Sequence, residues 1–181
     1  MYSDHARTSL NQVEEFMFEL LQQGSGVASS AATYHVSAGG ARIRARLALH
    51  AGRALGRPET ESVAIAAACE LLHNASLVHD DLQDRDEMRR GQIAVWREYG
   101  DAMAICVGDL LLSAAYGALG AAGASTARLS VRMHRRIAEV IHGQCADLAL
   151  QHGANTSLEN YERVASGKSA PLLVLPLELA L

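Results

Sequence analysis

Aromatic residues are scarce in this chain: phenylalanine, tyrosine and tryptophan make up 4% of its 181 residues, and there are only three prolines. Hydrophobic residues nevertheless account for 49% of the sequence, so the core must be built from alanine, leucine, valine and isoleucine. An aliphatic composition with few prolines favours packed helices over strands. The composition therefore predicts an all-α fold, and the length is that of about one domain.

Cysteine is also rare, and its spacing excludes two common roles. Cys69, Cys106 and Cys145 are far apart and odd in number, which is typical neither of a disulfide framework nor of a zinc site. Residues 1–10 carry charges and lack the apolar stretch of a secretory signal. We therefore expect small buried thiols in a reducing compartment, and a cytoplasmic protein.

Excess positive charge and long apolar runs are missing as well. The 16 lysines and arginines are outnumbered by 20 aspartates and glutamates, which gives a net charge of -4. Because a nucleic-acid partner usually requires a basic face, no such partner is expected. No uncharged apolar run reaches the roughly 20 residues needed to cross a bilayer, so no transmembrane segment is predicted.

Helical periodicity runs through nearly the whole sequence, beginning with an apolar stripe over 10–21. Residues 24–40, rich in glycine and serine, are predicted to form a loop, and 85–91 a polar turn. Further helices are predicted over 42–55, 59–84, 101–119, 125–151 and 157–165. Together these segments predict an antiparallel helical bundle.

The most informative motif is an acidic cluster at the end of the 59–84 segment, where Asp80 and Asp81 are followed by Asp84. Three carboxylates on one helical turn concentrate enough negative charge to hold magnesium, and Asp80 and Asp84 lie at i and i+4 on one helix face. Arg89 and Arg90 follow one to two turns later, and guanidinium groups suit the phosphate oxygens that such a metal ion would share. The pattern indicates a diphosphate–metal site, although an acidic helix face alone is more often simply solvated.

This motif belongs to an ordered set of landmarks. The stretch 71–84, followed by Arg89-Arg90-Gly91-Gln92, closely resembles the trans-isoprenyl diphosphate synthases, the polyprenyl synthetase family. The other matching landmarks are Gly39-Gly40-x-Arg42-Ile43-Arg44, Gly108-Asp109-Leu110-Leu111, Gly143-Gln144-x-x-Asp147 and Lys168-Ser169. The resemblance implies an all-α bundle around a central substrate cavity, of which this chain would hold the N-terminal two-thirds. It also implies a Mg²⁺-dependent prenyltransferase that joins an allylic diphosphate to isopentenyl diphosphate, head to tail.

The same resemblance implies roles for individual residues. Asp80 and Asp84 would ligate the magnesium ion, and Asp81 would complete the polar mouth beside them. With Lys168, these three aspartates make up the expected catalytic set. The residues expected at the allylic diphosphate are Arg89, Gln144, Asp147 and Lys168.

By the same resemblance, isopentenyl diphosphate would be held by Arg44, His73 and Arg90. The family's usual segment is Gly-Gly-Lys-x-x-Arg, but this sequence has Ala41 at the lysine position. Losing a cation could remove a charge-assisted contact of roughly 1.5–3 kcal/mol from a diphosphate pocket. Arg42 is one residue off and is expected to point elsewhere on the helix. This departure puts acceptor affinity, and acceptor identity, in question.

Two small residues, Ala75 and Ser76, lie one turn before Asp80. Family members with short products tend to place an aromatic residue at this depth of the tunnel that takes the growing apolar chain. The tunnel is therefore expected to be open here, with Leu71 and Leu72 as the next obstacles. The sequence predicts products longer than those of the short-chain members.

A second aspartate-rich motif, which the family places on a later helix, is missing, because no aspartate follows Asp147. The apolar segment 172–181 also ends without a glycine or a polar cap. We therefore expect residues 1–181 to form a single isoprenyl diphosphate synthase domain that is truncated at its C-terminus and incomplete as an enzyme alone.

Three functional hypotheses remain open. The first is the prenyltransferase, or a fragment of one. The second is a non-catalytic homologue that acts as a regulatory or partner subunit of a complete synthase, which Ala41 and the missing motif favour. The third is a class I terpene cyclase, which needs no isopentenyl diphosphate site; the presence of Arg44, His73 and Arg90 argues against it. The resemblance also implies a homodimer formed through helices near the middle of the chain.

Overall fold

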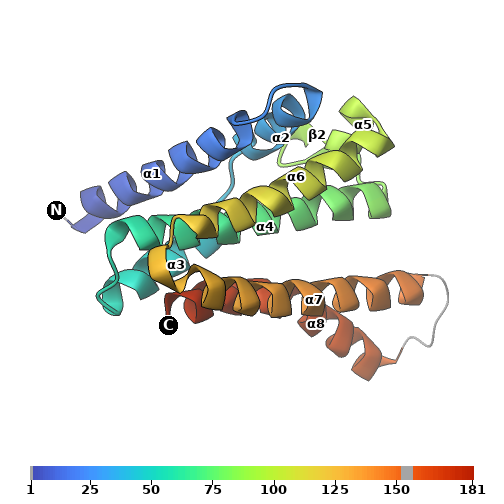
Figure 1. Ribbon diagram of the computed structural model, residues 1–181. Coiled ribbons are helices and arrows are strands. Elements are labelled where there is room, and N and C mark those ends of the chain that lie inside the picture. The colour runs from blue at the N-terminus through green and yellow to red at the C-terminus, as the bar shows by residue number, and fades with distance from the viewer. Residues whose placement is uncertain (1, 152–156) are drawn as a thin grey trace.

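The computed structural model describes residues 2–151 and 157–181, and most of them are helical. The elements are α1 (Tyr2–Gln22), α2 (Val27–Ser37), α3 (Ile43–Ala54), α4 (Glu59–Asp84), β1 (Met88–Arg89), β2 (Gln92–Ile93), α5 (Val95–Tyr99), α6 (Asp101–Gly120), the short 3₁₀ helix η1 (Gly123–Ser125), α7 (Thr126–Gln151) and α8 (Leu158–Ala180). Long helices lie roughly side by side along the molecule (Figure 1). The predicted all-α fold is confirmed.

Helix α4 lies at the centre of the bundle because it is apolar on most of its sides. Its residues from Ala64 to Leu72 are all buried, and the helix packs against α1, α3, α6 and α8. Helix α6 runs antiparallel beside it, while α7 and α8 form a second antiparallel pair below (Figure 1). The predicted bounds 59–84 are confirmed. The acidic motif therefore occupies the last two turns of the central helix.

Helix α6 combines length with a high apolar content. Within residues 2–151 and 157–181, it alone is long and apolar enough to span a membrane by length and composition. Its Ala104, Val107, Leu111 and Ala115 are buried in the core. Because the core helix of a bundle has the same composition, this feature is only weak evidence for a membrane span.

The loop predicted over 24–40 is wrong, because helix α2 occupies most of it. Ala31, Ala32 and Val36 are buried, and α2 packs against α1 and α6. This packing outweighs the low helix propensity of the surrounding glycines and serines. The predicted breaks survive only at the two ends, where Gly26 and Gly40 have φ values of 124° and 129° that favour glycine.

Helix α8 begins as predicted but ends much later than the predicted residue 165. The Ser157 side chain accepts a hydrogen bond from the Asn160 backbone N–H, as an N-cap does. The helix then continues through Pro171 and Pro176 to Ala180. Each proline removes one backbone hydrogen bond, but burial of the apolar side chains around them holds the helix in place. These buried side chains are Leu172, Leu175 and Leu179.

The predicted polar turn after α4 leads into a small hairpin. Met88 pairs with Ile93, and Arg89 pairs with Gln92. The chain reverses at Arg90 and Gly91, whose φ values of 52° and 80° suit a two-residue hairpin turn. The Tyr34 hydroxyl of α2 donates a hydrogen bond of 2.9 Å to the Ile93 carbonyl. The hairpin thereby holds both arginines near α2 and α4.

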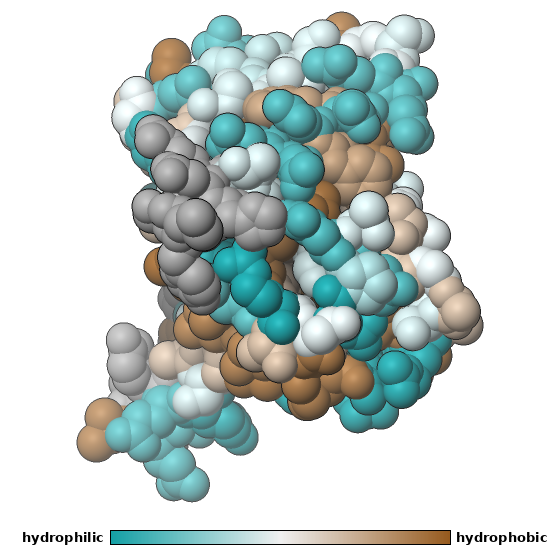
Figure 2. Space-filling view, turned by 90° about the vertical axis from the view of Figure 1, so that its left-hand side faces the viewer, coloured by the Kyte–Doolittle hydropathy of each residue, from teal (hydrophilic) through white to brown (hydrophobic). Residues whose placement is uncertain are grey.

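Large apolar side chains remain exposed on the α7–α8 pair. Figure 2 shows apolar surface gathered on the lower part of the molecule, where these two helices lie. The exposed residues on this pair include Val131, Ile141, Leu173, Val174 and Leu177.

Candidate active site

A cavity of about 450 Å³ lies between α4, α6, α7 and α8, and α3 also contributes to its wall. Its volume is in the range of small-molecule sites. Asp80, Gln83, Gln144 and Lys168 form its polar part. The apolar part of the wall lies further toward the N-terminal ends of α4 and α7 and consists largely of Leu72, Ala75, Ile137, Val140, Ile141 and Leu172. The cavity is thus polar near the C-terminal end of α4 and apolar below it.

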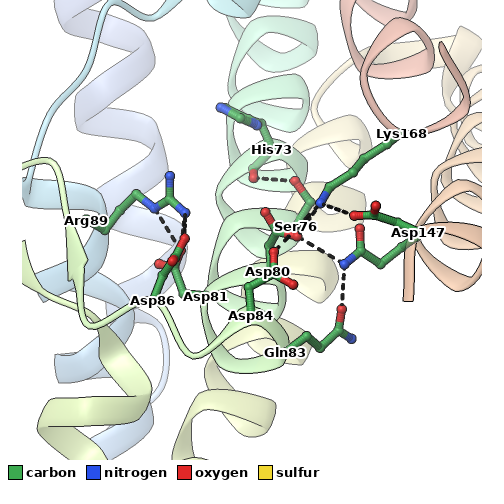
Figure 3. Close-up of polar contacts among 11 residues, drawn as sticks. His73, Ser76, Asp80, Asp81, Gln83, Asp84, Asp86, Arg89, Asp147 and Lys168 are labelled. Atoms are coloured by element: carbon green, nitrogen blue, oxygen red, sulfur yellow. Dashed lines mark hydrogen bonds and ion pairs between the residues drawn. The ribbon is translucent and has the colours of Figure 1, made fainter. Parts of the chain in front are cut away.

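The polar part is organised around the ammonium group of Lys168. Its Nζ lies 2.7 Å from Asp80 Oδ1, 3.0 Å from Asp147 Oδ2 and 4.0 Å from Asp84 Oδ2. Burial lowers the pKa of Lys168, but its hydrogen bonds to Asp80 and Asp147 outweigh this and raise the pKa overall. The ammonium group is therefore charged near neutral pH, and it links α4, α7 and α8 (Figure 3).

A glutamine pair completes this network. The Gln144 side-chain amide donates to Asp80 Oδ1 at 3.0 Å and to Gln83 Oε1 at 2.8 Å. Gln144 and Asp147, which the resemblance suggested as residues of the allylic diphosphate site, therefore face the acidic motif from α7. Gln83 was not predicted as a site residue, and its place between two aspartates is the one signal that could have indicated it.

Asp81 takes a different direction from its neighbour Asp80. Its side chain is 1% exposed, and Oδ1 accepts a hydrogen bond of 2.8 Å from Arg89 Nε and a second one from Arg89 Nη2. In Figure 3 this pair lies on the other side of α4 from Lys168 and Asp147. Burial raises the pKa of the Asp81 carboxyl, and the bonds from Arg89 offset part of that increase. The structure thus has Asp81 paired with Arg89 rather than at the polar mouth of the cavity.

The expected acceptor residues gather in a cationic cluster near the hairpin. Arg44 and His73 line the cavity. Arg90 Nη1 donates to the Gly39 carbonyl and lies 3.4 Å from Asn74 Oδ1. Gly40 has a φ of 129°, which favours glycine, and a Cβ atom there would lie 2.9 Å from the Arg90 guanidinium carbon. Gly40 therefore lets the backbone lie close to the Arg90 guanidinium group.

Burial decides the charge of this cluster. It lowers the pKa of His73 to about 3, assisted by the nearby guanidinium groups of Arg44 and Arg90. The imidazole is therefore neutral near pH 7. Burial also lowers the pKa of Arg44, which remains charged. The carboxylate of Glu70, 2% exposed, accepts a hydrogen bond of 3.0 Å from the Ala45 backbone N–H and anchors the start of α3 beside Arg44.

Arg42 does not replace the cation missing at Ala41. Its side chain is buried, with Nε 2.9 Å from Glu14 Oε1 and Nη2 3.0 Å from the Val36 carbonyl. It therefore points toward α1 and α2 and elsewhere than Ala41, as expected, but it precedes α3 with a left-handed φ of 49° and is not part of the predicted helix, while Ala41 is exposed.

The two predicted chain-length residues, Ala75 and Ser76, both line the cavity. The Ser76 hydroxyl donates to the His73 carbonyl at 2.7 Å, so it is satisfied by the helix and presents little polarity to the cavity. His79 and Asp109 also line the cavity, with His79 Nε2 3.7 Å from Asp109 Oδ1. Gly108 makes room for this histidine, because a Cβ there would lie 2.0 Å from His79 Nε2.

The described residues contain no group of three or more histidine, cysteine, aspartate or glutamate side chains arranged to hold a metal ion by themselves. Asp80, Asp84 and Asp147 nevertheless already surround one cation, the Lys168 ammonium. Magnesium is commonly bound by one or two carboxylates, with waters and substrate phosphates completing its shell. The donor set therefore fits a magnesium ion shared with a diphosphate.

Comparison with known proteins places this geometry in a family. The profile described as Polyprenyl synthetase matches residues 26–181. The (2E,6E)-farnesyl diphosphate synthase of Mycobacterium tuberculosis is 38% identical over 141 residues, which are 77% of this chain and 39% of that protein. Octaprenyl diphosphate synthase of Escherichia coli is 36% identical over 139 residues, 77% of this chain and 42% of that protein.

A solved structure agrees over a longer stretch. The geranylgeranyl pyrophosphate synthetase of Pyrococcus horikoshii superposes with a TM-score of 0.90 at 33% identity, over 98% of this chain and 55% of that one. The chain thus spans between about two fifths and just over half the length of these relatives.

Proposed function

The chain belongs to the polyprenyl synthetase family, and from this premise we propose that it takes part in magnesium-dependent prenyl transfer. The reaction condenses an allylic diphosphate with isopentenyl diphosphate to a longer trans-polyprenyl diphosphate. One observation carries the proposal: a single cavity with a largely apolar wall is lined both by Asp80 and Lys168 of the carboxylate network and by Arg44 and His73 of the cationic cluster.

The acidic side suits the allylic substrate. Asp80 and Asp84 would hold the magnesium ion, which when bound supplies positive charge to the leaving diphosphate. Lys168 would exchange its carboxylate partners for diphosphate oxygens and keep its charge near the carbon that loses the diphosphate. Arg89 is paired with Asp81 on the other side of α4 and would contact the same diphosphate after leaving this pair. Gln144 and Asp147 would position the groups around it.

The cationic side suits the acceptor. Arg44, His73 and Arg90 would hold isopentenyl diphosphate so that its alkene reaches the allylic carbon as the C–O bond breaks to an allylic cation. The alkene then attacks and a proton is lost. Within residues 2–151 and 157–181 no protein base is identified, and the released diphosphate is the proposed proton acceptor. The new apolar chain would extend past Ala75 and Ser76, whose small side chains favour products longer than those of the short-chain members.

The proposal extends to the organisation of the protein. Residues 1–181 are proposed to form one isoprenyl diphosphate synthase domain, and the expected assembly is a cytoplasmic homodimer. The 181 residues contain no second aspartate-rich motif. A complete site would therefore draw its remaining aspartates from outside these residues.

A second candidate function is that of a partner subunit that binds diphosphate without turning it over. Ala41 supports it, because the acceptor cluster lacks one cation. The exposed apolar side chains of α7 and α8 also suit packing against further helices. A class I terpene cyclase is disfavoured, since such an enzyme has no use for the cluster at Arg44, His73 and Arg90.

Product analysis separates these functions. The purified chain is incubated with magnesium and geranyl, farnesyl or geranylgeranyl diphosphate, with and without isopentenyl diphosphate, and products are identified by liquid chromatography–mass spectrometry. Elongation supports the prenyltransferase, and hydrocarbon formed without isopentenyl diphosphate supports a cyclase. Substrate binding without turnover, combined with stimulation of a complete prenyl synthase, supports the partner subunit. Absence of both turnover and diphosphate binding would refute the proposal.

A further inference from the structure

His35, on the helix α2, is a buried histidine in the cationic cluster. It is 3% exposed, and its Nε2 atom is buried without a hydrogen-bond partner among the described residues. The charged groups that act on it most strongly are Arg90 and Arg89 of the hairpin, followed by Arg42, and it also interacts with the Asn74 side chain. A buried polar nitrogen without a partner requires an explanation.

Three further nitrogens in the same cluster share this property. In the part of the chain that the structure describes, His73 Nδ1, Arg44 Nε and Arg42 Nη1 are also buried without a partner. His35, Arg44 and His73 come from α2, α3 and α4, and His35 and His73 are close enough to affect each other electrostatically. Unpaired buried polar atoms are rare and commonly mark a missing ligand. The guanidinium groups beside these atoms indicate that this ligand is an anion.

The arginines of the cluster are not all available to such an anion. Arg89 is paired with Asp81, and Arg42 is paired with Glu14. Arg44 and Arg90 form no ion pair with a carboxylate among the described residues, although the buried Glu70 acts on both. With Ala41 in place of a lysine, two guanidinium groups would face a diphosphate that carries more than two negative charges.

We propose that His35 supplies the missing charge: its Nε2 atom binds a proton from solvent when the acceptor diphosphate enters the cluster. No covalent bond changes, and the imidazole becomes an imidazolium ion that counters the charge of the bound anion. This inference rests on the proposed function, because the acceptor diphosphate is the anion that it requires. A lysine at 41 would be charged at all times, whereas His35 makes acceptor binding depend on pH.

The electrostatics of the cluster agree with this role. Burial, and then repulsion from Arg90 and Arg89, lowers the pKa of His35 to about 4, with Asn74 acting in the opposite direction. The free chain therefore holds His35 neutral at pH 7. A diphosphate among the arginines cancels their repulsion and attracts the proton, so the pKa rises in the complex. Binding then takes up protons between these two pKa values, and affinity falls as the pH rises through the upper one.

Calorimetry of the full chain tests the inference with inorganic pyrophosphate as the probe, without metal. Titrations at pH 7 in two buffers of different ionisation enthalpy give the number of protons taken up. Pyrophosphate itself exchanges protons, so the measure is the difference between wild type and H35Q. We expect H35Q to bind about tenfold more weakly and to take up fewer protons. H134Q, at an exposed histidine of α7, is the matched control and should behave as wild type.

The double variant H35Q/A41K distinguishes loss of a positive charge in the cluster from a packing defect caused by the substitution of His35. A lysine at the exposed position 41 should restore affinity without restoring proton uptake, which repair of a packing defect would not do. ¹⁵N NMR of the wild-type imidazoles gives a test without any variant at His35, because pyrophosphate should shift Nε2 of His35 to its protonated value. Equal proton uptake by wild type and H35Q, or an unchanged His35 signal, would overturn the role of His35 alone. Failure of wild type to bind pyrophosphate would overturn the acceptor site itself.

Discussion

Replacing Lys168 by methionine tests whether its ammonium competes with a metal ion for the same carboxylates. Lys168 Nζ forms contacts of 2.7 Å with Asp80 and 3.0 Å with Asp147, and the three side chains are 28%, 20% and 26% exposed. A charge-assisted hydrogen bond contributes about 1.5–3 kcal/mol when buried. Partial exposure reduces this to roughly 1 kcal/mol for each contact. A divalent ion that displaces the ammonium must break both contacts, so its binding free energy is less favourable by about 2 kcal/mol in the wild-type protein.

The variant K168M should consequently bind Mn²⁺ roughly 30-fold more tightly than wild type when no diphosphate is present. With pyrophosphate added the order should reverse, because the ammonium then contributes to binding the anion. Electron paramagnetic resonance of free Mn²⁺ gives both affinities directly and needs no turnover. K168R, which keeps the charge, serves as the comparison. Equal Mn²⁺ affinity of K168M and wild type without pyrophosphate would refute the competition.

Three further predictions concern the packing, the cavity and the α7–α8 pair. Gly108→Ala should lower the free energy of unfolding by about 1–3 kcal/mol, because its Cβ would lie 2.0 Å from the imidazole nitrogen packed on it. Gly117 lies in the same helix as Gly108, but a Cβ there would lie 3.8 Å from its nearest neighbour in another helix, the Leu20 side chain of α1. Gly117→Ala should therefore be neutral or stabilising, and urea denaturation compares the two variants. Ser76→Phe should fill the cavity below the aspartates and shorten the products, as read by mass spectrometry; unchanged lengths would exclude Ser76 from the chain path. Arg136 lowers the pKa of Glu178, so this carboxylate stabilises the fold at neutral pH and that contribution is lost as the pH falls through its lowered pKa. Glu178→Gln should therefore destabilise at pH 7 by about 1 kcal/mol and make little difference in acid, which thermal unfolding at several pH values would show.

The central helix α4 shows which structural features can be predicted from local composition and periodicity. Its bounds, its burial and the shared face of Asp80 and Asp84 follow from apolar composition and from the 3.6-residue period, both of which are local properties. The same local rules failed at α2, where buried alanines outweigh a composition rich in glycine and serine. They also failed for α8, predicted to end at residue 165, because packing of its apolar side chains carries the helix on through Pro171 and Pro176 to Ala180.

Some residues of the candidate site were likewise predicted from the sequence, and others were missed. The motif residues Asp80, Gln144, Asp147 and Lys168 were predicted from the resemblance, and the structure brings them together in one network. His35 was missed because it lies in a segment read as a loop and belongs to none of the motifs. A buried histidine becomes informative only when its unpaired nitrogen and its arginine neighbours are known.

The sequence by itself determined the helical class, the central acidic helix and the family, because each depends on residue type and short spacing. Only the tertiary structure decided which partner each carboxylate of the acidic motif binds. Asp80 and Asp81 are adjacent in the chain, yet successive residues on a helix point about 100° apart. One of them therefore meets Lys168 from α8, and the other meets Arg89 from the hairpin. Those partners are set by how the helices pack, which no local spacing specifies.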